Sequence, residues 1–129
     1  QKLGSPECSY KDYAMYINKF LLNKVVAVIN ADIVLGEGFQ MIKPEYVKVQ
    51  NIAYSLTRHG SNSNETCQLK NFCLSPYKGS HDTHIFFIDT PFNETILQFL
   101  NYPVNINGAE NQFMYAIVTH LGKGISNPC

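Results

Sequence analysis

Apolar and polar positions repeat with two different periods along this chain, and each period predicts a different element. In Lys11–Val28 the apolar side chains recur every three or four residues, as in a helix that lays one face on a sheet. Short apolar runs in Val47–Leu56, His84–Asp89 and Phe113–His120 predict strands. A helix followed by strands predicts an α+β fold, in which the N-terminal helix packs on a twisted antiparallel sheet.

Weaker signals complete this outline. Ser9 or Asp12 is the candidate cap of the helix, Ile96–Leu100 is a short strand candidate, and Asn107-Gly108 is a typical turn pair. The chain has 129 residues, which is the size of one domain, and it contains no repeat or linker. We therefore expect a single domain over residues 1–129.

Charge makes some classes of partner less favourable than others. Apolar residues make up 45% of the chain and charged residues 16%, and the formal net charge is zero. Proteins that bind nucleic acid mainly through its phosphates usually carry a basic excess, so RNA is a weaker expected partner than protein. No apolar run is long enough to span a membrane, and we expect no membrane partner.

The cysteines indicate a disulfide framework in an oxidising compartment. The chain has four cysteines, at Cys8, Cys67, Cys73 and Cys129, and four cysteines allow three pairings. We prefer Cys8–Cys129, which would tie the two termini together, and Cys67–Cys73, which would close a tight loop. In the chain-entropy model the long closure would contribute about 4–5 kcal/mol to stability.

Two glycosylation motifs also favour secretion. They are Asn64-Glu65-Thr66 and Asn93-Glu94-Thr95. The chain starts at Gln1 with no signal peptide, as the mature form of a secreted protein does.

Histidines and one carboxylate are the first candidates for chemistry. His81 and His84 have a spacing that metal sites use, but no Cys-x-x-Cys pair accompanies them, so we expect neither a metal nor another cofactor. His59 and His120 each end a predicted strand, and Asp89 ends a third. Polar groups at strand ends can converge at one rim of a sheet.

The last part of the chain resembles a known family. The stretch Asn111–Gly124, in which Thr119-His120 ends the predicted strand before a glycine-containing loop, and the closing Cys129 together resemble the C-terminal end of the small fungal guanyl-specific extracellular ribonucleases. In that family the matching histidine is the catalytic acid. The terminal cysteine of the family bridges back to one near the N-terminus, which agrees with the preferred Cys8–Cys129 pairing.

Two further segments resemble the same family in the same order. Phe86–Pro91 is similar to the strand that carries the family's catalytic glutamate, with Asp89 in its place. His59 is similar to the family's other catalytic histidine, and Asn62 and Glu65 match positions of its base-recognition loop. The resemblance implies that His59 and Asp89 would take the proton of the ribose 2′-hydroxyl while His120 protonates the leaving oxygen.

Three departures weaken the implied activity. The segment Asn101–Ile106 has no basic residue where the family places its arginine, so no cation is expected to offset charge on the phosphoryl group. Asp89 is about 1 Å shorter than glutamate, which matters for a positioned reaction. Ser61 and Asn64 stand where an aromatic ring would stack the base.

The retained scaffold with a degraded site resembles the ribonuclease-like secreted virulence effectors of plant-pathogenic fungi, especially powdery mildews. That resemblance implies a protein without catalytic activity that is delivered into the host cell, binds host protein or RNA and is detected in some cases by a plant immune receptor. We expect it to be a monomer. Two alternatives stay open. One is an active extracellular endoribonuclease that uses His59, Asp89 and His120, and the other is a cystatin-like secreted inhibitor with a helix on an antiparallel sheet.

Overall fold

The computed structural model describes residues 7–31, 33–35, 37–57 and 81–127. Within these ranges helices and strands are mixed along the chain, and the α+β class is confirmed. The elements in order are α1 (Tyr10–Phe20), β1 (Lys24–Ile29), the 3-10 helix η1 (Glu37–Met41), α2 (Pro44–Gln50), β2 (Ile52–Thr57), β3 (His81–Ile88), α3 (Glu94–Phe99), α4 (Ala109–Leu121) and β4 (Gly124–Ser126).

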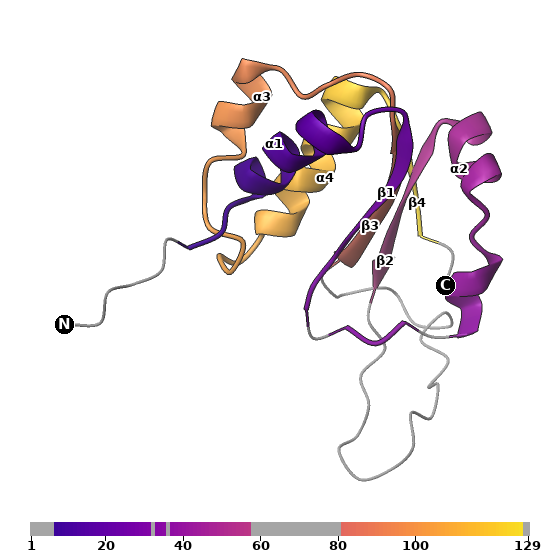
Figure 1. The fold of residues 1–129 in the computed structure, drawn as a ribbon. Coiled ribbons are helices and arrows are strands. Elements are labelled where there is room, and N and C mark those ends of the chain that lie inside the picture. The colour runs from indigo at the N-terminus through magenta and orange to yellow at the C-terminus, as the bar shows by residue number, and fades with distance from the viewer. Residues whose placement is uncertain (1–6, 32, 36, 58–80, 128–129) are drawn as a thin grey trace, which may run out of the picture.

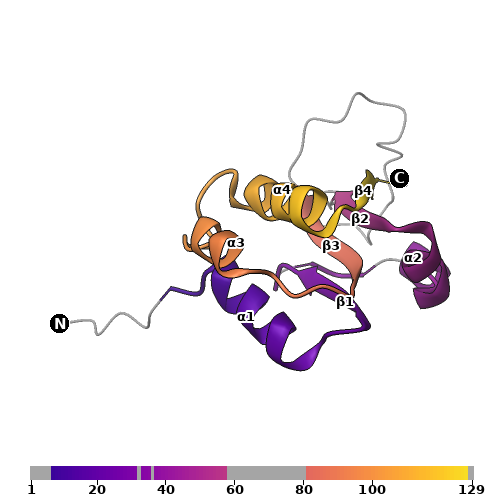
Figure 2. The same cartoon turned by 90° about the horizontal axis from the view of Figure 1, so that it is seen from above.

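The strands form one mixed sheet in the order β1-β3-β2-β4. β3 is central and antiparallel to both β1 and β2, whereas β4 runs parallel to β2 at the edge. Helices α1, α3 and α4 lie on one side of the sheet, and η1 and α2 lie on the other (Figures 1 and 2). The expectation of one helix on a purely antiparallel sheet is therefore too simple, because helices cover both faces and one strand pair is parallel.

The first helix begins where the sequence predicts and ends earlier. The Ser9 hydroxyl accepts a hydrogen bond from the Asp12 amide, and the Asp12 carboxylate accepts from the Ser9 amide at 2.8 Å, which is a capping box. The helix stops at Phe20, and the predicted continuation to Val28 is wrong. Residues 24–29 are rich in β-branched side chains, and their backbone pairs with β3 instead.

The segment Phe113–His120 is helical, which corrects the prediction of a strand there. Its apolar run fits both periods, but Phe113, Ile117 and Leu121 lie four residues apart and are all buried on one face of α4. The helix ends at Gly122, whose φ of 62° places it in the left-handed conformation that glycine adopts easily. His120 is therefore in the last turn of a helix.

Two other strand predictions are corrected as well. Val47–Leu56 divides at Asn51, which has a φ of 51°, into the end of α2 and the strand β2. Ile96–Phe99 lies in α3, which starts at Glu94 and ends before Leu100, and the Asn93 side chain caps this helix by accepting a hydrogen bond from the Ile96 amide. The turn predicted at Asn107-Gly108 is confirmed, and Gly108 has a φ of 84°.

The main core lies between the sheet and the helices α1, α3 and α4. Phe113 is at its centre, because its ring stacks on Tyr10 with centroids 4.8 Å apart and meets Phe86 edge-on at 6.1 Å. The buried members of this core are Tyr10, Ala14, Ile17, Val26, Ala53, Phe86, Ile88, Phe92, Leu100, Ala109, Phe113, Ala116, Ile117 and Leu121.

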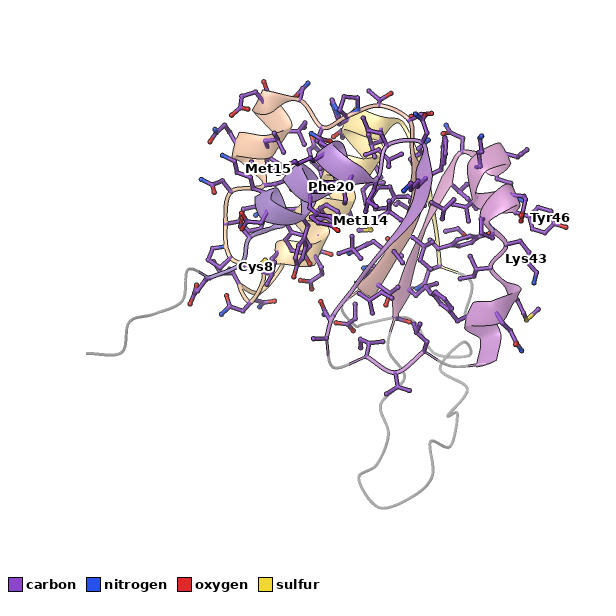
Figure 3. All side chains as sticks on the ribbon, in the orientation of Figure 1. Cys8, Met15, Phe20, Lys43, Tyr46 and Met114 are labelled. Carbon is purple, nitrogen blue, oxygen red and sulfur yellow. The ribbon has the colours of Figure 1, made fainter. Side chains whose placement is uncertain are left out.

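Among the cysteines that the structure describes no disulfide is seen, and Cys129, the predicted partner of Cys8, lies outside the described residues. Cys8 is an exposed free cysteine, and its backbone carbonyl accepts a hydrogen bond from Val104 at 3.1 Å. Cys8 lies at the start of α1, whereas β4 lies at the far edge of the sheet (Figures 1 and 3). Cys67, Cys73 and Cys129 lie outside the described residues, so the Cys67–Cys73 pairing stays a prediction.

No helix in the described part of the chain is long and apolar enough to cross a bilayer. The longest, α4, has 13 residues. At about 1.5 Å per residue it extends about 20 Å, which is shorter than the hydrocarbon core of a membrane.

Candidate functional site

Two of the three predicted strand-end residues can be placed. Asp89 directly follows β3, as predicted, whereas His120 lies on α4. His59 lies outside the described residues, as do Asn62 and Glu65. We call the region where β3 and α4 end the β3–α4 end, and define it by Asn51, Asp89, Pro91, His120 and Lys123.

The His120 ring is held against the loop that leaves β3. Its Nε2 atom is 3.0 Å from the Pro91 carbonyl oxygen, and because a carbonyl only accepts, Nε2 carries the proton and donates. The ring also stacks on Phe92, with centroids 5.9 Å apart and planes at 24°. The nitrogen that an acid catalyst would use is thus engaged within the protein.

The same loop is fixed from the other side by α1. The Asn18 side chain donates to the Phe92 carbonyl and accepts from the Phe92 amide, both at 2.8 Å. This pair of hydrogen bonds and the contact with His120 fix the backbone between β3 and α3. The loop is therefore a structural joint between α1, α3 and α4.

Lys123 is a buried cation that the sequence pattern did not mark. Its Nζ atom donates to Asn51 Oδ1 at 2.8 Å, lies 5.7 Å from the centroid of the Phe87 ring and is 3.9 Å from Asp89 Oδ2. Asp89 is half-exposed, and it also accepts from the Thr90 hydroxyl at 3.3 Å. The only signal in the sequence is that Lys123 directly follows Gly122, the residue that ends α4.

Asn51 contacts Lys123 and also the two residues on either side of it, Gly122 and Gly124. Its Nδ2 atom donates to the Gly122 carbonyl at 3.1 Å, and its own carbonyl accepts from the Gly124 amide at 3.1 Å. Asn51 thereby connects the α2–β2 turn to the α4–β4 turn. Lys123 fills the space between them, and this position suits a structural role.

Lys123 lies beside Asp89, but its charged group is buried. The sequence predicted no basic group near Asp89, and Lys123 supplies one at 3.9 Å. Its side chain is only 3% exposed, so Nζ does not reach solvent, where a phosphate would bind. Asp89 and His120 flank Pro91, and among the described residues no hydrogen bond joins them. An acid–base pair acting on one substrate is not formed by these contacts.

A second polar pair lies in the core. Ser55 Oγ is 3.0 Å from His84 Nδ1, and both side chains are buried. His84 Nε2 has no hydrogen-bond partner and the ring lies edge-on to Phe113 at 5.5 Å. Burial, with a smaller contribution from His81, lowers the pKa of His84 to about 4. A serine–histidine pair is the arrangement of a nucleophile and its base, but no substrate reaches a pair buried in the core.

The described residues contain no group of three or more His, Cys, Asp or Glu side chains that could hold a metal ion. His84, one of the two histidines with metal-site spacing, is instead bonded to Ser55.

Apolar side chains are exposed on the far side of the sheet from the main core. We call this the η1–α2 surface and define it by Met41, Tyr46 and Val49, which are 75%, 61% and 82% exposed. Tyr46 and Val49 share one face of α2, because residues three apart on a helix are neighbours. Figure 3 shows Tyr46 pointing away from the sheet. On the opposite face of α2, Val47 is buried against the sheet.

A second group of exposed apolar side chains lies on α1. Tyr16 and Phe20 have ring centroids 4.9 Å apart, and Lys19 Nζ lies 5.0 Å from the Phe20 centroid. Met15 is also exposed on this helix (Figure 3). These rings are partly covered by one another and by Lys19, whereas the η1–α2 side chains have no such ring contacts among the described residues.

Comparisons with protein-family models, with curated proteins and with solved structures give no match to this chain.

Proposed function

We propose that this chain is a secreted virulence effector of the ribonuclease-like kind found in plant-pathogenic fungi, which enters the host cell and binds a host protein without cleaving RNA. The observation that carries the proposal is the η1–α2 surface. A helix of seven residues buries Val47 on one face and exposes Tyr46 and Val49 on the other. Contiguous exposed apolar side chains on a soluble domain are typical of a protein-binding surface.

The contacts at the β3–α4 end support the absence of catalysis. The His120 Nε2–H group donates a hydrogen bond to the Pro91 carbonyl oxygen, and Lys123 is buried against Asn51 and Phe87. RNA cleavage needs a free acid and an accessible cation to offset charge on the phosphoryl oxygens. Both groups are used in holding the loop and the turns together.

A host protein also suits the charge of the chain better than RNA does. The formal net charge is zero, and electrostatic attraction to phosphates is the main source of non-specific affinity for nucleic acid. Aromatic and aliphatic side chains such as Tyr46 and Met41 bind proteins through burial of apolar area. An immune receptor that detects the effector would use an exposed surface of this kind.

RNA cleavage by the purified protein tests the catalytic part of the proposal. We expect no cleavage above that of a blank, and the same result for His120→Ala and Asp89→Asn. Cleavage that is lost in His120→Ala would overturn the proposal and favour the active endoribonuclease. Thermal unfolding of each variant would show that a loss does not come from misfolding.

The binding part is tested by infection assays in plant tissue that expresses the chain. We expect Tyr46→Glu to abolish the promotion of infection, because a charge would replace the exposed aromatic ring of the η1–α2 surface. Tyr16→Glu is the matched control, since it places the same charge on an exposed tyrosine of α1. Equal loss in both variants, or in neither, would contradict the assignment of the surface.

A further inference from the structure

Asn93 occupies an exposed position at the start of α3, where only one end of its amide is used. Its Oδ1 atom accepts a hydrogen bond from the Ile96 amide at 3.0 Å and so caps the helix. In the described part of the chain no hydrogen bond uses its Nδ2 atom. Asn93, Glu94 and Thr95 are all exposed, and they form an Asn-x-Thr acceptor motif.

The cap and a glycan do not compete for the same atom. An N-linked glycan is attached through Nδ2, and the substituted amide keeps the carbonyl oxygen that caps the helix. Asn18 shows the contrasting case, because both of its amide atoms are bonded to the Phe92 backbone at 2.8 Å. The geometry of Asn93 therefore leaves the reactive nitrogen free while the fold uses the oxygen.

We infer that Asn93 is an N-glycosylation site that carries its glycan without loss of the α3 cap. This inference rests on the secretory part of the proposed function. The donor is an oligosaccharide linked to a lipid pyrophosphate. The bond between the sugar C1 and the phosphate oxygen breaks, and a bond between C1 and Nδ2 forms. The lipid pyrophosphate leaves with the electron pair, and the amide proton passes to a base of the transferase.

The position of Asn93 determines which surface the glycan leaves open. Asn93 lies two residues after Pro91, at the exposed start of α3. The helix α3 lies on the opposite side of the sheet from α2 (Figures 1 and 2). The η1–α2 surface would therefore remain accessible to a protein partner in the glycosylated form.

The test is expression of the full chain behind a cleavable secretion signal in yeast, in an Asn64→Gln background that removes the other acceptor motif. Removal of the signal shows that the chain entered the secretory pathway, whatever its natural route. We expect one N-glycan, which a peptide:N-glycosidase removes while converting Asn93 to an aspartate that peptide mass mapping detects. Thr95→Ala should lose the glycan, and Thr95→Ser should keep it.

A processed chain without a glycan at Asn93 would overturn the inference and leave the proposed function standing. Failure of the natural source to secrete the protein would instead contradict the proposed function. The cap is tested by the midpoint of thermal unfolding, which we expect to be equal in the glycosylated chain and in Thr95→Ala, and lower in Asn93→Ala. A glycosylated chain as unstable as Asn93→Ala would show that the cap is lost.

Discussion

The two faces of the central strand β3 are covered in different ways. On one face Phe86 and Ile88 pack against α1 and α4 in a core centred on Phe113, whose side chain is 0% exposed. On the other face Ile85 and Phe87 are buried as well, and in the described part of the chain that side of the sheet carries only the seven-residue helix α2 and the 3-10 helix η1. One face of β3 is thus covered by the aromatic core. The other is covered, within the described residues, by the short helices α2 and η1, which we call the thin cover.

Apolar residues of the main core stabilise the fold, whereas exposed apolar residues of α2 do not. Residues of the main core contact one another across helices and sheet, so their removal leaves cavities. In α2 the apolar side chains point both ways, and Tyr46 and Val49 contribute little to burial. We therefore expect stability to depend on the core face, and binding on the outer side of α2.

The largest effect should come from Phe113→Ala. This ring touches Tyr10, Phe86, Phe92 and His84, and its loss should lower the free energy of unfolding by about 3–5 kcal/mol. The matched change on the other side, Tyr46→Ala, should alter it by less than about 0.5 kcal/mol. Chemical denaturation measures both values.

A comparable loss in Tyr46→Ala would erase the distinction between the two faces. If Phe113→Ala does not fold, Phe113→Leu provides a smaller cavity at the same place. A Phe113→Leu variant as stable as the original protein would contradict the central role of this ring.

The second effect is a dependence of stability on pH that originates in the core. The pKa of His84 is lowered from 6.5 to about 4, chiefly by burial. Between these values the unfolded chain binds a proton that the folded chain does not, so stability rises with pH across this window. Above about pH 6.5 the titration of His84 has no effect on the free energy of unfolding. Lowering the pH to about 4 reduces that free energy by about 3 kcal/mol, because the unfolded chain takes up the proton.

Replacing both partners of the buried pair isolates this contribution. In Ser55→Ala/His84→Leu the carboxylates still make stability depend on pH, but the dependence that comes from His84 is absent. We expect a shallower decline in the free energy of unfolding between pH 6.5 and 4, measured by denaturation at several pH values. Parallel curves for the two proteins would mean that His84 is already charged in the folded state.

The elements that could be predicted from the sequence are those fixed by local chemistry. The start of α1 follows from Ser9 and Asp12, which bond to each other three residues apart. β3 follows from an apolar run too short for a helix, and its residues 84–88 lie in the predicted strand. Asp89 therefore has the strand-end position that its sequence context predicts.

The rest depends on contacts between distant residues. The apolar run of α4 suits a strand or a helix, and packing of Phe113 on β3 and α1 selects the helix. This choice moves His120 from a strand end to a helix end. The bond between Lys123 and Asn51 joins residues 72 positions apart, so no local pattern reveals it. Of the site residues that the structure describes, Asp89 is the one whose place at the end of a strand was predicted.

A third prediction concerns Asn51, which connects the α2–β2 turn to the α4–β4 turn. Asn51→Ala removes the oxygen that accepts from Lys123 and the nitrogen that donates to Gly122. It also leaves alanine at a φ of 51°, a left-handed conformation that asparagine tolerates better than alanine does. We expect a loss of about 2–3 kcal/mol in the free energy of unfolding. Asn51→Gly keeps the backbone geometry at no strain, and it should lose about 1 kcal/mol less.

Equal losses in the two Asn51 variants would show that the side-chain bonds dominate. A negligible loss in both would mean that Lys123 is satisfied without Asn51, and that the two sides of the sheet are not joined at this point. Denaturation at neutral pH distinguishes these results.

The smallest effect is expected for valine substitutions within the helix α2. Val47 and Val49 are two residues apart in α2, but Val47 is 1% exposed and Val49 is 82% exposed. Val47→Ala removes two buried methyl groups facing the sheet, and should cost about 1–2 kcal/mol. Val49→Ala should leave the free energy of unfolding within about 0.5 kcal/mol and weaken only partner binding. A larger loss in Val49→Ala than in Val47→Ala would mean that the outer side of α2 is covered by other parts of this chain, and the η1–α2 surface would then not be free to bind a partner.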